Sequence, residues 1–103
     1  AGVDALVEVH DIDEAVVARG AGATLIGVNN RNLTTFSTDL GVAEAIATTV
    51  QGDGIVTVAE SGIHTPDDAR RMEDAGYDAI LVGEALVVAD DPAALLSRLV
   101  GRP

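Results

Sequence analysis

The sequence predicts an α/β fold in which four strand–helix units build one parallel sheet. Two observations predict this class. Short segments rich in Val, Ile, Leu and Ala recur four times along the 103 residues, at intervals of about 20 to 30 residues that suit a strand, a helix and their connections. Helix start and stop signals lie between these segments. No linker or low-complexity stretch interrupts them, so a single domain is expected over residues 1–103.

The four apolar segments are the predicted strands. Each is nearly continuous in apolar residues rather than alternating, which is typical of parallel strands covered on both faces. Their spacing implies right-handed crossovers through the intervening helices. The strands are predicted over residues 5–9, 24–28, 55–59 and 79–82.

The first two helices are predicted from their capping residues. Asp11 can cap the first helix, with Glu14 three residues later completing a capping box, and Gly20 marks the end. Thr38 can cap the second helix, which is predicted over residues 39–49.

The last two helices are predicted from proline and glycine. Thr65 precedes Pro66, which suits the first helical position, and Gly76 is a natural stop. A fourth helix is predicted to open at residues 91–92 and to end at Gly101.

Composition excludes several classes of protein. The chain has 17 acidic and 6 basic residues, which argues against a nucleic-acid partner because phosphate backbones are bound by Lys and Arg. No apolar run approaches the ~20 residues that span a bilayer, and no signal peptide is visible, so we expect a cytoplasmic protein without membrane contact. Without Cys or metal-ligand spacing, neither a disulfide nor a metal site is predicted. The acid excess is either a solvated helix surface or an adaptation to high salt, and composition does not choose between them.

Two folds fit this pattern. One is a short doubly wound sheet of the flavodoxin type, and the other is half of an eight-stranded βα-barrel. In both folds ligands bind at the carboxyl ends of the strands. The polar residues that follow the predicted strands are therefore the candidate site.

Glu8 is the most unusual residue of the first strand, because it lies inside an apolar run. Strand alternation places it on one face with Leu6, while Val7 and Val9 take the other. Burying a carboxylate among aliphatic groups costs several kcal/mol unless it is paired or its pKa rises. We expect a buried Glu8 that takes part in proton transfer or stabilises a developing positive charge.

Amide and guanidinium groups follow the second strand, and Glu60 ends the third. Asn29 and Arg31 are interpreted as the polar middle of a substrate site, whereas Asn30 and Asn32 are interpreted as loop residues. Glu60 either holds a substrate hydroxyl or pairs with Arg31, and these two readings stay open.

A phosphate site is predicted where the last two strands end. Ser61-Gly62 and Gly83 let the backbone approach an anion closely, and each precedes a helix start whose N–H groups favour negative charge. Glu84 is expected to contribute only its backbone N–H. The two histidines, His10 and His64, are interpreted as capping, surface or loop residues rather than catalytic bases.

With these residues in view, the chain resembles the C-terminal half of indole-3-glycerol-phosphate synthase, a βα-barrel enzyme of tryptophan biosynthesis. The resemblance covers almost the whole chain and implies half of a TIM (βα)8 barrel, its strands five to eight. It rests on four motifs in the family's order and spacing: LVEVHD at 6–11, LIGVNNRNL at 25–33, VAESGIHTPDD at 58–68 and DAILVGEAL at 78–86.

The resemblance also implies an activity and roles for residues. Members of the family cyclise 1-(o-carboxyphenylamino)-1-deoxyribulose 5-phosphate to indole-3-glycerol phosphate, releasing CO2 and water without a cofactor. Carried over residue by residue, Glu8 resembles the active-site carboxylate and Asn29 the catalytic amide. The implied substrate-binding residues are Arg31, Glu60 and Ser61, and the implied phosphate-binding residues are Gly62, Gly83 and Glu84.

One part of the family's site has no counterpart here. The resemblance places the general-acid lysine in the first four strands, and this chain contains no Lys. We therefore expect a fragment of the synthase that binds a phosphorylated small molecule but is inactive by itself. The alternative is a non-catalytic half-barrel that binds phosphate and self-associates, because unpaired sheet edges favour pairing with another chain. A homo-oligomer and a complex with a missing N-terminal half are both open as partners.

Overall fold

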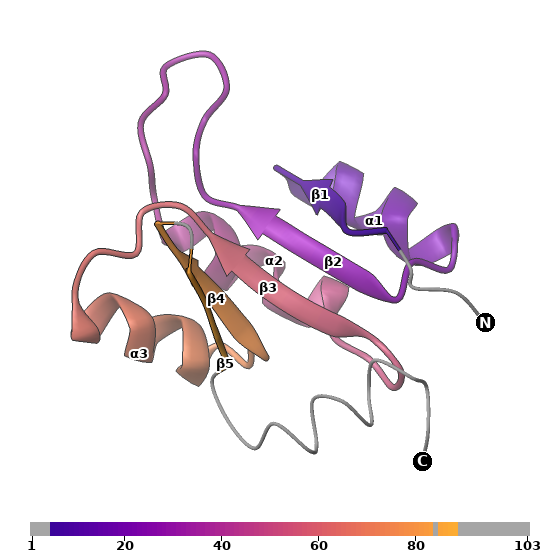
Figure 1. Ribbon diagram of the computed structural model, residues 1–103. Coiled ribbons are helices and arrows are strands. Elements are labelled where there is room, and N and C mark those ends of the chain that lie inside the picture. The colour runs from indigo at the N-terminus through magenta and orange to yellow at the C-terminus, as the bar shows by residue number, and fades with distance from the viewer. Residues whose placement is uncertain (1–4, 84, 89–103) are drawn as a thin grey trace.

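The chain folds as strands and helices that alternate along the sequence (Figure 1). The computed structural model describes residues 5–83 and 85–88. The α/β class and the four predicted strands are confirmed, with the bounds of the first three shifted by one or two residues and those of the fourth as predicted. The elements are β1 (Val7–Val9), α1 (Ile12–Gly20), β2 (Leu25–Asn29), α2 (Gly41–Val50), β3 (Val56–Glu60), α3 (Pro66–Asp74), β4 (Ala79–Val82) and β5 (Ala85–Val88).

The strands lie side by side in the order β1-β2-β3-β4-β5, and the first four are parallel. One row in register across this sheet joins Val9, Val28, Ala59 and Ile80. All four pack in one core cluster with residues of α1, α2 and α3. The described helices therefore cover a single face of a consecutively ordered sheet. That arrangement fits part of a βα-barrel and excludes the doubly wound alternative, in which helices cover both faces.

The sequence predicted a parallel sheet, but the sheet in the structure is mixed. Strand β5 pairs antiparallel with β4, from Ala79 opposite Val88 to Val82 opposite Ala85. Two residues connect these strands, and the first, Gly83, has φ +59°, a backbone region that suits tight hairpins. Apolar residues resume directly after the turn and form a strand, where the sequence had predicted a connection leading to a helix. Glu84 and the predicted fourth helix lie outside the described residues.

Two of the three described helices begin as predicted. The Asp11 carboxylate accepts the Glu14 N–H at 2.8 Å, but the capping box at this helix is wrong, because Glu14 accepts the N–H of His10 instead. Helix α3 has a complete capping box between Thr65 and Asp68. Helix α2 begins later than predicted, with Leu40 rather than Thr38 as its N-terminal cap.

The side chain of Asn30, which directly follows β2, helps to cap α2. Its side chain is buried, and its Oδ1 accepts the N–H of Ala43 at 2.9 Å in the first turn of α2. Its Nδ2 donates to the carbonyl of Ser61 at 3.1 Å, after β3. The interpretation of Asn30 as a loop residue is therefore wrong. Asn32 is a loop residue as predicted, since its Oδ1 accepts the N–H groups of Thr34 and Thr35.

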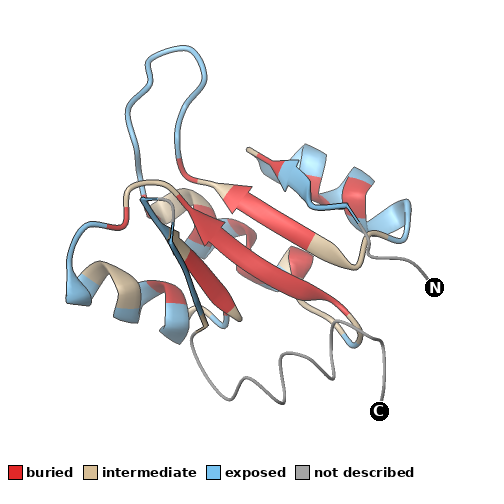
Figure 2. Cartoon of the chain, viewed as in Figure 1, coloured by how far each residue is buried: buried red, intermediate tan, exposed pale blue. Residues whose placement is uncertain are grey.

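Burial is deepest at the middle of the sheet and decreases toward β1. Strand β3 is buried along its whole length, whereas β1, α1 and the loop that connects β2 to α2 are largely exposed (Figure 2). The polar ends of β2 and β3 thus lie on a rigid support. Among the described residues, none of the helices has the length and apolar character that crossing a bilayer requires.

Candidate active site

Three of the predicted site residues come together on the face of the sheet opposite the helices. Parallel register places Glu8 beside Gly27, and Asn29 beside Glu60 one pleat further along. Their alternation with the core-facing residues Val9 and Val28 puts all of these side chains on the helix-free face. The sheet thus brings two carboxyl groups and an amide to one place from three consecutive strands.

Glu8 is not buried, contrary to the prediction. Its side chain is 43% exposed, because β1 is the edge strand of the described sheet and nothing in the described residues lies beyond it. The Asn29 side chain contacts it, and Asn29 Nδ2 donates to Glu8 Oε1 at 3.3 Å. The amide orientation follows from a second bond, because Asn29 Oδ1 accepts the N–H of Arg31 at 2.9 Å.

Glu60 is the carboxyl group that the fold buries; it is 7% exposed. Its side chain reaches over Gly27 toward Glu8, and a Cβ at position 27 would collide with Glu60 Oε2. Among the described residues, no N–H or O–H group of another side chain or the backbone donates to that oxygen. The neighbouring group on this face is the Glu8 carboxyl, and a hydrogen bond can form between the two carboxyl groups only while one of them carries a proton.

The surroundings decide which group holds that proton. Burial is the largest cause that raises the pKa of Glu60 to about 7, and the negative charge of Glu8 and a hydrogen bond to its carboxyl group act in the same direction. His10 acts in the opposite direction and lowers this pKa. Near neutral pH both the protonated and the ionised form of Glu60 are therefore populated, so Glu60 can either donate or accept a proton, as general acid–base chemistry requires.

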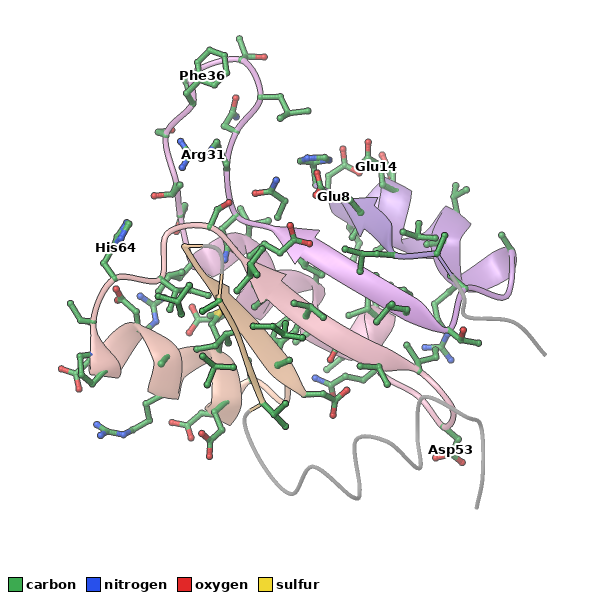
Figure 3. All side chains as sticks on the ribbon, viewed as in Figure 1. Glu8, Glu14, Arg31, Phe36, Asp53 and His64 are labelled. Carbon is green, nitrogen blue, oxygen red and sulfur yellow. The ribbon has the colours of Figure 1, made fainter. Side chains whose placement is uncertain are left out.

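Arg31 does not pair with Glu60, so that alternative is wrong. Its guanidinium Nη1 donates to the carbonyl of Phe36 at 3.1 Å and holds the two sides of the loop after β2 together. Figure 3 shows Arg31 between the arms of this loop and Glu8 at the end of β1. Arg31 thus orders the loop that borders both parts of the site.

Two of the predicted phosphate residues, Gly62 and Gly83, line a separate cavity of about 370 Å³ at the ends of β3 and β4, together with Ser61 and Arg31. Ser61 and Gly62 have φ of 69° and 78°, a region that a serine adopts only at a cost of roughly 1 kcal/mol or more. Among the described residues, none accepts a hydrogen bond from the N–H of Gly62 or Ile63. A cationic guanidinium and free backbone N–H groups are the donors that bind phosphate.

Sequence reasoning missed the contribution of His10 and Glu14. His10 Nε2 lies 3.2 Å from Glu8 Oε1, and its Nδ1 lies 3.1 Å from Glu14 Oε1. Strand alternation was the available signal, because it directs positions 8 and 10 to the same face. Within residues 5–83 and 85–88, no three His, Cys, Asp or Glu side chains are placed to share a metal ion.

The collision at Gly27 gives a probe of the carboxyl pair that changes no charge. In Gly27→Ala we expect the Glu60 carboxyl to move away from Glu8, and the pKa of Glu60 to fall as their hydrogen bond is lost. Carbon-detected NMR titration of the Glu side chains would measure it. Gly20→Ala is the matched control, since a Cβ there meets nothing within 4 Å. An unchanged Glu60 titration in Gly27→Ala would contradict the described geometry.

Comparison with known proteins agrees with the resemblance seen in the sequence. The profile of the family described as indole-3-glycerol phosphate synthase matches residues 1–99. Relatives named indole-3-glycerol phosphate synthase from Carboxydothermus hydrogenoformans and Koribacter versatilis are 46% and 48% identical over 96% and 97% of this chain. Indole-3-glycerol phosphate synthase 2 from Streptomyces coelicolor is 50% identical over 97% of it. The chain spans about 38% of the length of each of these three relatives.

Proposed function

Because the chain belongs to the indole-3-glycerol phosphate synthase family, we propose that it supplies part of the active site for the synthase reaction. In that reaction the anilino ring carbon that bears the carboxylate bonds to the carbonyl carbon of the deoxyribulose chain. The carboxylate leaves as CO2, and the hydroxyl formed from the carbonyl then leaves as water. The observation that carries the proposal is the convergence of Glu8, Asn29 and Glu60 on one face of the sheet.

Each residue has a role that its contacts support. The Glu8 carboxylate stabilises the positive charge that develops on the substrate, and Asn29 both orients Glu8 and contacts the substrate. Glu60, with a pKa near 7, exchanges a proton with a substrate hydroxyl during dehydration. Ser61 contacts the substrate between this pair and the phosphate cavity.

The cavity beside Ser61 is proposed to hold the substrate phosphate. Gly62 and Gly83 let the backbone come close to the phosphate oxygens, and the Arg31 guanidinium compensates their charge. The backbone of Glu84 is proposed to complete this site. A cation at this point matters in a chain with a net charge of −11, which otherwise repels an anionic substrate.

The resemblance implies a general-acid lysine for ring closure, and this chain contains no Lys. We therefore propose that the 103 residues are inactive alone and act with further βα units that pair with the β1 edge. To test this, the part of the Streptomyces coelicolor relative that this chain does not match would be joined to it. Formation of the fluorescent indole product is expected from the joined protein and not from the isolated chain. Turnover by the isolated chain at a rate like that of the joined protein would contradict the proposal.

Glu8→Gln in the joined protein separates chemistry from folding. We expect kcat to fall by about 10² or more, because a neutral amide cannot stabilise the developing charge. Full activity in Glu8→Gln would remove the proposed role of Glu8. If the joined protein folds but makes no product while the isolated chain self-associates and binds phosphate, the non-catalytic half-barrel is the better reading.

Phosphate binding can be tested on the isolated chain. Glycerol phosphate at millimolar concentration is expected to raise its melting temperature, because a ligand that binds only the folded state stabilises it. Gly83→Asp should abolish this shift by placing a carboxylate in the cavity. Gly54→Asp is the matched control, since Gly54 shares with Gly83 the positive φ and the open space around an added Cβ but does not line this cavity. Equal shifts in the two variants would contradict the assignment of the cavity.

A further inference from the structure

His10 is the residue that joins the carboxyl pair to the first helix. Its ring lies between two carboxylates, with Nε2 3.2 Å from Glu8 Oε1 and Nδ1 3.1 Å from Glu14 Oε1. The ring is mostly covered, with 22% of the side chain exposed. Its backbone N–H also donates to Glu14 Oε1 at 2.6 Å, so Glu14 holds both the backbone and the ring of His10.

Glu8 needs such support, because its own position leaves it free to move. It lies on a three-residue edge strand, and its side chain is 43% exposed. The bond that Asn29 donates to Glu8 Oε1 is long at 3.3 Å, and His10 Nε2 lies 3.2 Å from the same oxygen. A reacting carboxylate must be held within about half an ångström of its working position, so whatever fixes the ring also sets the reactivity of Glu8.

We propose that His10 is a positioning residue, anchored by Glu14, that fixes the Glu8 carboxylate between Asn29 and Glu60. This inference deepens the proposed function and rests on the role of Glu8 in it. His10 does not face the phosphate cavity; it lines a second cavity, of about 500 Å³, with Asn29 and Arg31. Its action on the substrate therefore passes through Glu8.

The ring also sets the charge at the pair. When protonated, His10 brings a positive charge to within 3.2 Å of Glu8 Oε1 and 3.1 Å of Glu14 Oε1. The charged groups that face it come from every neighbouring element: Glu8 on β1, Glu60 on β3, Asp11 and Glu14 of the first helix region, and Arg31 and Asp39 of the loop after β2. The positive charge of His10 opposes the burial and the Glu8 charge that raise the pKa of Glu60.

A purely structural role is the competing explanation. Glu14 could serve only to cap α1 by accepting the His10 N–H. The two explanations predict different results for the ring and the backbone. Glu14→Gln keeps an oxygen for the His10 N–H but loses the charge beside Nδ1. His10→Gln keeps one donor group near Glu8 but cannot bridge the two carboxylates.

The first measurement uses the isolated chain and needs no activity. In His10→Leu, NMR titration of the Glu60 carboxyl is expected to show an upward shift of its midpoint, because the only group found to lower this pKa has been removed. A His10→Leu chain that keeps its fold and leaves the Glu60 midpoint unmoved overturns the proposal. This result does not depend on whether the synthase reaction occurs, so the two proposals fail separately.

The second measurement is kinetic and uses the joined protein, if active. His10→Leu is expected to lower kcat about tenfold with little change in KM, because the ion pair beside Glu8 is lost, and His10→Gln is expected to restore part of it. Glu14→Gln should lower kcat as well, whereas Asp13→Asn, which removes the neighbouring charge on the same helix turn, should not. If His10→Leu does not fold, equal kcat values in Glu14→Gln and Asp13→Asn overturn the proposal.

Discussion

Replacing Asn30 by alanine is expected to lower the free energy of unfolding by about 3 to 5 kcal/mol, the largest loss we expect from one polar side chain here. The amide bridges three segments of the fold. Its Oδ1 caps α2 through Ala43, and its Nδ2 fixes the carbonyl of Ser61 beside the active site. Alanine leaves both backbone groups without their partner and opens a cavity next to Met72.

Asn32→Ala is the matched control for this prediction. Asn32 lies two residues away, and its Oδ1 accepts two N–H groups, but it is exposed and water can replace it. We expect a loss below about 1 kcal/mol. Urea denaturation of both variants would measure the difference. Similar midpoints for the two variants would show that the bridge through Asn30 does not carry this stability.

Glu60→Gln is expected to stabilise the chain at alkaline pH and to remove activity from the joined protein. The Gln amide donates to Glu8 at every pH, whereas Glu60 donates only while it is protonated. Stability and the proposed activity place opposite demands on Glu60, because the proton that it gives up in the reaction is also the one that allows a hydrogen bond to Glu8. Loss of that proton transfer should lower kcat by about 10² to 10⁴.

The sign of the pH dependence follows from the raised pKa. The folded chain holds the Glu60 proton up to a pKa of about 7, whereas the unfolded chain releases it near 4.5. The stabilisation is therefore fully present below pH 4.5 and is lost as the pH rises through 7. A difference of this size corresponds to roughly 3 kcal/mol.

Stability measured by urea denaturation from pH 4 to pH 8 tests this directly. The chain with Glu60 should lose stability over this range relative to Glu60→Gln, and the two should agree at the acid end. Glu73→Gln removes one carboxylate from the exposed side of α3 and controls for the change in net charge. Parallel stability curves for Glu60→Gln and the unchanged chain would contradict the raised pKa. Glu8→Gln should reduce the slope only in part, since burial is the largest cause.

The elements could be predicted because their signals are local. Each predicted strand is a short apolar run, and Asp11, Thr65 and Pro66 marked helix starts within one residue. The start of α2 could not be found this way, because Asn30, the side chain that accepts its Ala43 N–H, belongs to a different segment. The β4–β5 hairpin was missed because a short apolar run after a glycine can form either a strand or a connection leading to a helix. Pairing with β4 decides that this run is a strand.

The sequence predicted which residues of the candidate site lie near each other more accurately than it predicted which of them is buried. Parallel strands end at one edge, so Glu8, Asn29 and Glu60 had to lie near each other once the strands were placed. Which carboxyl group is buried depends on the position of each strand within the sheet. Glu8 lies on an edge strand and Glu60 on a central one, so the expected burial of Glu8 is wrong and Glu60 is the buried carboxyl group.

The sequence by itself determined the α/β class, the positions of the strands and the face on which Glu8 lies, because these follow from patterns over a few residues. It also carried the resemblance to the synthase family through GVNNRNL and its neighbouring motifs. Only the tertiary structure decided that Glu60 reaches over Gly27 to share a proton with Glu8, and that His10 joins the pair. Burial and charge act through space, between residues that are up to 52 positions apart in the sequence, so no local pattern contains them.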